Sequence, residues 1–164
     1  MERILYLLKL NINKKIILKY ILFILSSKLK KNQRKKYISN FRNFLKKKKI
    51  TQDWFSHNVF DWYEEKDLIE TKKDFLEIGS FEGISALYVL ENYPNINLTC
   101  VDAWNAETDG NQNFNIKLVE KNFNTNIKKY KKRIKKIKNY SKVFFLQNKK
   151  KFDIIYVDGS HKAK

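Results

Sequence analysis

Acidic residues and glycines gather in three short segments of this 164-residue chain, each at the end of an apolar run. The segments are residues 75–83 (Phe-Leu-Glu-Ile-Gly-Ser-Phe-Glu-Gly), residues 100–104 (Cys-Val-Asp-Ala-Trp) and residues 152–161 (Phe-Asp-Ile-Ile-Tyr-Val-Asp-Gly-Ser-His). The chain has only four glycines, and three of them, Gly79, Gly83 and Gly159, lie in these segments. Glycine lets a backbone turn tightly or approach a ligand closely. The pattern therefore predicts a nucleotide-type binding site.

The acids around the first two glycines distinguish between classes of cofactor. A pyrophosphate needs glycines and free amides at a helix start, in the spacing Gly-x-Gly-x-x-Gly, without a carboxylate that competes with the phosphate. Here the spacing is Glu-x-Gly-x-x-x-Gly, and Glu77 and Glu82 flank the turn. Two acids suit a ligand with a positive end, such as the aminoacyl-sulfonium of S-adenosylmethionine. The segment favours that kind of cofactor over a dinucleotide.

Asp102 follows Glu77 by 25 residues and ends the next apolar run. A carboxylate at that place can accept hydrogen bonds from two ribose hydroxyls. Structural roles stay open for both acids, because Glu77 could form a salt bridge at a strand end and Asp102 could cap a helix or a turn.

Apolar runs alternate with helical patterns from residue 51 onwards. Strands are expected at residues 74–78, 98–101, 134–137 and 152–157, and helices at residues 56–68, 83–92, 114–129 and 141–147. Ser56 is expected to cap the first of these helices, and the apolar run of the last strand suits burial on both faces. The alternation predicts an α/β fold, a Rossmann-like doubly wound parallel sheet of about four strands in the order 3-2-1-4. Because ligands bind beyond the carboxyl ends of such strands, the three segments should meet at one edge of the sheet.

The net charge of +18 is distributed unevenly along the chain. Residues 1–50 carry +15, residues 51–116 carry −10 and residues 117–164 carry +13. Lysine is frequent throughout and the glycine motif lies in the acidic part, so the basic blocks are not specific for nucleic acid. The single cysteine, Cys100, lies in an apolar run, which predicts a buried thiol in a reducing compartment, the cytoplasm. Two histidines and one cysteine at these spacings make a structural zinc site a poor interpretation.

Residues 1–50 form a basic arm without proline or glycine. Its densest apolar stretch, residues 16–25, has ten residues and includes Lys19. A membrane span needs about 20 residues, so this stretch is too short. No small-residue cleavage site follows it, which argues against a signal peptide. We expect a basic amphipathic helical arm that either packs on the domain or lies peripherally on an anionic membrane surface.

The three segments resemble the motifs of class I S-adenosylmethionine-dependent methyltransferases. Within that class they match the branch called methyltransferase domain 24, which is similar to macrocin-type O-methyltransferases. The likeness covers residues 52–161 and includes a lead-in segment, Asp-Trp-Phe-Ser at residues 53–56. It implies that residues 51–164 are the N-terminal portion of such a domain, with S-adenosyl-L-methionine as cofactor. The residues implied to surround its methionine part, ribose and adenine are Glu77, Gly79, Ser80, Phe81, Gly83, Asp102, Trp104 and Ser141.

Asp158 and His161 are the candidates for chemistry on the acceptor. Methyl transfer to a hydroxyl is an in-line displacement that needs a positioned and partly deprotonated oxygen. A histidine, with an ordinary pKa of about 6.5, is suited to take that proton. Asp158 offers an oxygen ligand for Mg²⁺, which would lower the pKa of the acceptor. The alternatives are that Asp158 caps a turn in which Gly159 is left-handed, and that His161 is simply exposed.

The family continues beyond the fourth strand, whereas this sequence stops at Lys164. We therefore expect a truncated domain in which the fourth strand is a bare edge. Two functions follow from the sequence. The first is S-adenosylmethionine-dependent O-methylation of a small molecule or sugar. The alternative is a basic module that binds a membrane surface or nucleic acid, with the Rossmann-like part as a non-catalytic scaffold.

Overall fold

The computed structural model describes residues 14–105 and 114–159 and divides the chain into two compact units, residues 1–39 and 40–164. Helix α2 (Lys14–Leu29) belongs to the first unit, and α3 (Lys31–Leu45) crosses the division. The division lies earlier than the boundary at residue 50 that the sequence predicts. The end of α3 belongs to the second unit because the ring of Phe41 packs against those of Phe55 and Tyr88.

Helix α2 is apolar on much of its surface. None of the described helices is long and apolar enough to cross a membrane. Ile17 is buried and Tyr20, Ile21 and Ile24 are partly buried, but six other large apolar side chains of α2 are more than half exposed. They are Ile16, Leu18, Leu22, Phe23, Leu25 and Leu29. The arm thus presents apolar side chains as well as lysines to its surroundings.

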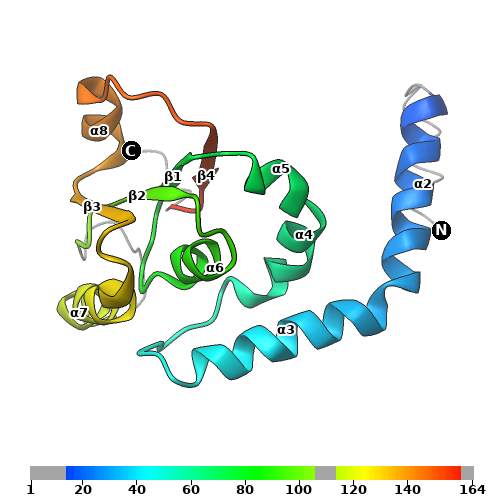
Figure 1. Cartoon of the computed structure of the whole chain (residues 1–164), viewed down its shortest axis with the longest axis horizontal. Helices are drawn as coiled ribbons and strands as arrows, with labels where there is room; N and C mark the ends of the chain where they lie inside the picture. The colour runs from blue at the N-terminus through cyan, green and yellow to red at the C-terminus, as the bar shows by residue number, and fades with distance from the viewer. Residues whose placement is uncertain (1–13, 106–113, 160–164) are drawn as a thin grey trace. The chain divides into compact units, whose positions relative to one another are not determined.

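A parallel four-stranded sheet in the order β3-β2-β1-β4 forms the centre of the second unit (Figure 1). The strands are β1 (Asp74–Ile78), β2 (Asn97–Asp102), β3 (Ile134–Lys138) and β4 (Ile154–Val157). Ile78 lies opposite Val101 of β2 and Val157 of β4, so the carboxyl ends of these three strands are level. The predicted fold class and strand order are confirmed.

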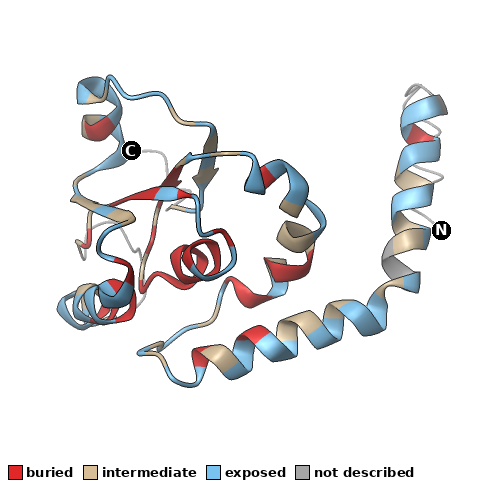
Figure 2. Cartoon of the chain, viewed as in Figure 1, coloured by how far each residue is buried: buried red, intermediate tan, exposed pale blue. Residues whose placement is uncertain are grey.

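Helices lie on both faces of this sheet. Helices α6 (Ile84–Asn92) and α7 (Ile116–Ile127), the latter followed by the turn η2 (Lys128–Tyr130), cover one face, and α8 (Ser141–Gln147) lies on the other. Alternate side chains of β1 serve the two faces: Phe75 packs against Trp62, whereas Leu76 and Ile78 form a core with Phe144 of α8. Burial is concentrated in β1, β2 and α6 (Figure 2).

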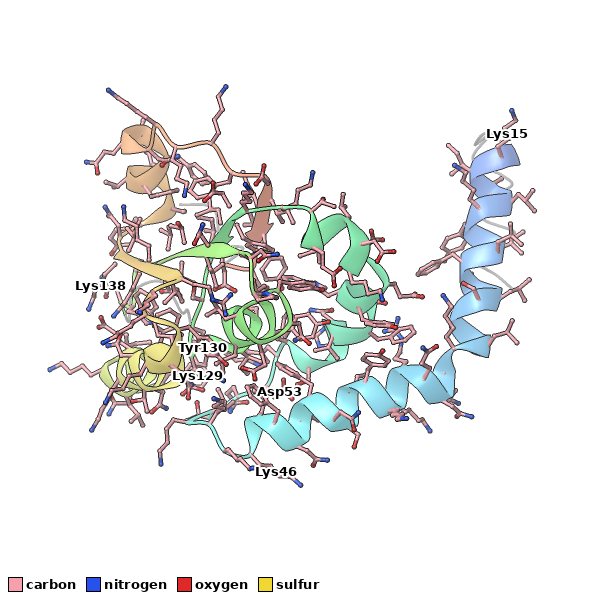
Figure 3. The ribbon with its side chains drawn as sticks, in the orientation of Figure 1. Lys15, Lys46, Asp53, Lys129, Tyr130 and Lys138 are labelled. Carbon is pink, nitrogen blue, oxygen red and sulfur yellow. The ribbon has the colours of Figure 1, made fainter. Side chains whose placement is uncertain are left out.

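The predicted helix at residues 56–68 is broken into three short elements, η1 (Ser56–Asn58), α4 (Val59–Glu64) and α5 (Lys66–Glu70). The prediction that Ser56 caps it is wrong. Asp53 is the acceptor at this turn: its Oδ1 accepts the Ser56 amide hydrogen (2.9 Å), and its Oδ2 accepts a hydrogen bond from Arg42 Nε (3.1 Å). Asp53 lies beside α3 (Figure 3). The acid thereby ties the lead-in segment to α3.

Strand β4 is not buried on both faces as predicted, because Ile155 and Val157 are 54% and 62% exposed. These two residues share a face with the α8 side of β1, and α8 packs mainly against β2. The opposite face of β4 is covered, since Tyr156 packs against Trp62 at a ring distance of 4.9 Å. The described part of β4 is a sheet edge with one apolar face open.

Candidate functional site

The carboxyl ends of β1, β2 and β4 bring the predicted segments together. The Gly79 amide donates to the carbonyl of Val101 at the end of β2 (2.8 Å). The Asp158 amide donates to the carbonyl of Ile78 at the end of β1 (2.8 Å). The loop at residues 79–83 therefore lies between the loops that follow β2 and β4, as the sequence predicts.

Asp102 fixes the loops after β1 and β2 to each other. Its Oδ2 accepts the amide hydrogens of Ser80 (2.8 Å) and Phe81 (2.9 Å), and its Oδ1 accepts that of Trp104 (2.7 Å). A carboxylate has about four acceptor positions, so roughly one stays available for a ligand. Asp102 thus has the turn-capping role that the sequence left open. In this arrangement it has room for one ribose hydroxyl rather than the two predicted, and the contact with ribose stays a prediction.

Phe81 and Trp104 adopt backbone conformations that bulky residues rarely adopt. Their φ angles are +47° and +40°, and no other non-glycine residue in the described ranges has a positive φ. The indole Nε1 of Trp104 donates to the carbonyl of Phe81 (2.9 Å), and both amides donate to Asp102. Such strain costs about 1–3 kcal/mol per residue and persists where the surroundings determine the conformation, typically at binding sites. The two loops form one strained, hydrogen-bonded unit.

Glycine is required at two positions of the first loop. Gly79 has a φ of +85°, and a Cβ there would lie 2.6 Å from the Asp158 carbonyl oxygen and the Gly159 backbone. Gly83 has a φ of +81°, and its Cβ would lie 2.9 Å from the ring of Phe123. Gly159 is different, because it is not left-handed and its Cβ would lie 3.9 Å from the nearest atoms, those of Ile78. The alternative of a left-handed Gly159 is therefore wrong.

Glu77 is buried beneath the loop, with 1% of its surface exposed. Its carboxylate accepts hydrogen bonds from Ser80 Oγ (2.7 Å), from Cys100 Sγ (3.2 Å) and from Ser85 Oγ. Burial raises the pKa of Glu77, and it also raises that of the Cys100 thiol, which is buried as predicted. The salt bridge considered for Glu77 is not found, since no cation pairs with it in the described part of the chain. A carboxylate surrounded by neutral donors is suited to a cationic ligand nearby.

A family model described as a methyltransferase domain matches residues 76–164, more than half of the chain. The match includes every loop of the site described above. The chain belongs to this methyltransferase family. No curated protein matches the sequence.

Solved structures show a related fold. A Podospora anserina methyltransferase, solved in an SAH-bound state, has a TM-score of 0.51 and 18% identity, over 85% of this chain and 58% of its own. A Staphylococcus aureus protein assigned as a caffeoyl-CoA O-methyltransferase has a TM-score of 0.48 and 18% identity, over 80% of this chain and 59% of its own. This methyltransferase chain thus spans less than three fifths of the length of either protein.

Trp104 and Ser141, the residues implied to lie near the adenine, differ in accessibility. Trp104 is 5% exposed, and its ring packs against that of Phe123 (4.8 Å) with the ammonium group of Lys136 at 4.4 Å. A buried indole offers little surface to a ligand. Ser141 is exposed at the start of α8, beyond the carboxyl end of β3, and so lies at the same sheet edge as Asp102. Both roles stay predictions.

Of the two residues expected to act on the acceptor, the structure describes only Asp158. Tyr156 Oη donates to Asp158 Oδ2 (2.9 Å). Burial and the neighbouring Asp158 carboxylate raise the pKa of Tyr156, which keeps the hydroxyl protonated as a donor. Ser160 and the candidate base His161 lie outside the described residues.

The donor set does not fit Mg²⁺. Six oxygen ligands are usual for this ion, and at least one or two carboxylates hold it in most proteins. No group of three or more His, Cys, Asp or Glu side chains that could hold a metal is found in residues 14–105 and 114–159. Of the acceptor-side residues that the structure describes, Asp158 is the one candidate ligand, and it already accepts from Tyr156. We assign no step to a metal.

Two residues near the loop have roles that the sequence did not reveal. Glu82 was interpreted as an acid facing a cationic ligand, but its carboxylate is fully buried and accepts from the amide and the hydroxyl of Thr51. Trp54 packs on Phe81 at a ring distance of 4.8 Å, although it is 48% exposed. The resemblance of residues 53–56 to a lead-in segment was the only signal for Trp54. Nothing in the spacing pairs Glu82 with Thr51.

Proposed function

We propose that this chain binds S-adenosylmethionine and transfers its methyl group to a hydroxyl of a small molecule or sugar. The proposal depends on one observation, the loop at residues 79–83 that Asp102 fixes above the buried carboxylate of Glu77, which has no cation partner among the described residues. Membership of the methyltransferase family supports it, and the Podospora anserina protein of similar fold is SAH-bound.

The residues of the site fit such a cofactor. When bound, S-adenosylmethionine supplies an electrophilic methyl group on a positively charged sulfur. Glu77 places a buried carboxyl group beneath the loop, and Asp102 keeps one acceptor position for a ribose hydroxyl. Glycine at residues 79 and 83 lets the loop pack closely on the Asp158 and Gly159 backbone and on the ring of Phe123, which fixes the shape of the loop.

The acceptor hydroxyl must lose its proton as it is methylated. We assign that proton to an imidazole nitrogen of His161, because histidine is poised to accept one near neutral pH. Asp158, whose Oδ2 is held by the Tyr156 hydroxyl, orients the acceptor or the imidazole. This division of roles leaves binding to the loops after β1 and β2, and proton transfer to the loop after β4.

Calorimetry with S-adenosylhomocysteine tests the proposal. The wild-type chain should bind it, and Asp102→Asn should weaken binding by about tenfold or more, because an amide cannot accept all three backbone hydrogens. Asp153→Asn is the matched control: its Oδ2 also accepts two backbone amides, those of Lys73 (2.9 Å) and Asp74 (3.0 Å), but at the opposite edge of the sheet. The control should keep wild-type affinity. A wild type that does not bind, or an unimpaired Asp102→Asn, would contradict the proposal.

We also propose that residues 1–50 bring the protein to an anionic membrane surface. Two observations support this partner: the charge of +15 in that segment, and the exposed apolar side chains of α2. A basic helix with exposed leucine and phenylalanine side chains binds such surfaces by burying apolar area next to anionic headgroups.

A further inference from the structure

The carboxylate of Glu82 ties Thr51, which lies just before the lead-in segment, to the loop at residues 79–83. Glu82 is 0% exposed, and its Oε2 accepts the Thr51 amide hydrogen at 2.6 Å. Its Oε1 accepts from the Thr51 hydroxyl (3.0 Å) and from Asn122 Nδ2 (2.7 Å). A buried carboxylate with three neutral donors holds its partners strongly, since each hydrogen bond is charge-assisted.

Asn126 reinforces this connection from α7. Its Nδ2 donates both to the Glu82 carbonyl (2.9 Å) and to the Lys49 carbonyl (2.9 Å), and its Oδ1 accepts the Lys49 amide hydrogen (2.9 Å). The backbone at residues 49–51 is thereby fixed to the loop at residues 79–83. We name this set of contacts, formed by Glu82, Asn126, Lys49 and Thr51, the tether.

The tether places Trp54 on the loop at residues 79–83. Three residues after Thr51, the Trp54 indole lies 4.8 Å from the ring of Phe81 and 5.6 Å from that of Phe114. Phe81 is one of the two strained residues, and its amide is bonded to Asp102. Trp54 nevertheless leaves 48% of its surface exposed, in contrast to Trp104 at 5%. An exposed indole on a strained loop residue is an apolar platform next to the site.

We propose that the indole of Trp54 packs against the acceptor, and that the acceptor contains a ring with an apolar face. Glu82 is the positioning residue that holds Trp54 in place. The inference rests on the proposed function in one respect, that the loop at residues 79–83 binds the methyl-bearing end of the cofactor. A surface beside that end meets the acceptor. Aromatic rings and the C–H faces of sugars both pack on indole, so the shared chemistry is a ring with an apolar face, and the experiment separates the two sources.

The tether is tested without any ligand, by acrylamide quenching of tryptophan fluorescence in a Trp62→Phe background. There Trp54 is the accessible indole, because Trp104 is buried. Glu82→Gln should raise the quenching constant roughly twofold, since the segment that carries Trp54 becomes more mobile without these hydrogen bonds. Glu65→Gln, an exposed glutamate on the same unit, is the control and should change nothing. Thr51→Val, which lacks the hydroxyl, should resemble Glu82→Gln in part, and Thr51→Ser should restore wild-type quenching.

Ring binding is measured by ligand-observed NMR with two probes, 2-naphthol and methyl β-glucopyranoside, in the presence of S-adenosylhomocysteine. At least one probe should bind the wild type, and Trp54→Ala should weaken that binding by about tenfold, whereas Trp54→Phe should retain most of it. Glu82→Gln should weaken binding of the same probe. The double variant Glu82→Gln/Trp54→Ala should bind the probe no more weakly than Trp54→Ala, because Glu82 acts through Trp54. The probe that binds identifies the source of the ring.

The outcomes separate the two proposals. A wild type that fails to bind S-adenosylhomocysteine overturns the proposed function, while the quenching result still decides the tether. A wild type that binds S-adenosylhomocysteine but neither ring overturns the role of Trp54. Unchanged quenching in Glu82→Gln, or additive losses in the double variant at equal thermal midpoints, overturns the positioning role of Glu82.

Discussion

Acids with similar sequence contexts have different surroundings in this site. Glu77 and Glu82 flank the same turn, but Glu77 accepts from side chains beneath the loop and Glu82 accepts from Thr51, just before the lead-in segment. Left-handed Gly79 lies between the two acids, and left-handed Gly83 follows Glu82. Of the two, only Glu77 keeps its proposed role toward a cationic ligand, which makes its ionisation the property to measure.

We predict that Glu77→Gln changes how stability depends on pH. Burial raises the pKa of Glu77 in the folded protein above its ordinary value of 4.5. The stabilisation from the neutral carboxyl is therefore present at low pH and is lost as the pH rises through the folded pKa. As the pH rises above about 4.5, the unfolding free energy of wild type should therefore fall relative to that of Glu77→Gln. Urea denaturation of both proteins across this range measures the difference, and parallel pH profiles would contradict the prediction.

At the scale of elements, the loops after β1 and β4 meet backbone to backbone. The close approach explains why the loop needs glycine at residue 79 but not at residue 159, although the sequence presents both in similar motifs. A Cβ at Gly79 would overlap the Asp158 carbonyl, whereas one at Gly159 would make an ordinary van der Waals contact with Ile78. Glycine identity alone does not reveal which position is constrained.

Gly79→Ala and Gly159→Ala form a matched pair. Gly79→Ala combines a left-handed φ with the overlap, so it should cost about 3 kcal/mol or more of unfolding free energy and abolish S-adenosylhomocysteine binding. Gly159→Ala should stay within about 0.5 kcal/mol of wild type. Thermal unfolding and calorimetry on both variants test this, and similar losses in the two would show that the observed contact between the loops does not form.

The strands could be predicted from sequence because buried parallel strands are short apolar runs, and β1 matches its expected bounds at Asp74 and Ile78. The meeting of the three motifs followed from the sheet topology. What could not be predicted depends on contacts between distant residues: the hydrogen bonds of Thr51 to Glu82, and which face of the predicted edge strand β4 is open at Ile155. Periodicity reports how far a residue is buried locally, but not which partner buries it.

At the scale of the whole molecule, charge and chemistry are separated along the chain. The acidic middle part carries the loops after β1 and β2, whereas +15 of charge lies in residues 1–50 and +13 in residues 117–164. An adenosyl-sulfonium ligand is drawn to an acidic site, and an anionic surface is drawn to a basic arm. The two partners proposed for this methyltransferase therefore do not compete for the same charges.

We predict that the full-length protein floats with vesicles that contain phosphatidylserine and not with neutral phosphatidylcholine vesicles. Binding should be strong at about 0.05 M salt and reduced several-fold at about 0.5 M salt, because salt screens the basic arm. Leu22→Asp/Phe23→Asp should weaken retention at low salt, since both side chains are more than half exposed on α2 and supply apolar area. Leu118→Asp, at an exposed leucine of α7, is the matched control and should float like wild type. Retention that depends on salt but is equal in the α2 variant and the control would assign the binding to charge alone and contradict a role for the apolar surface of α2.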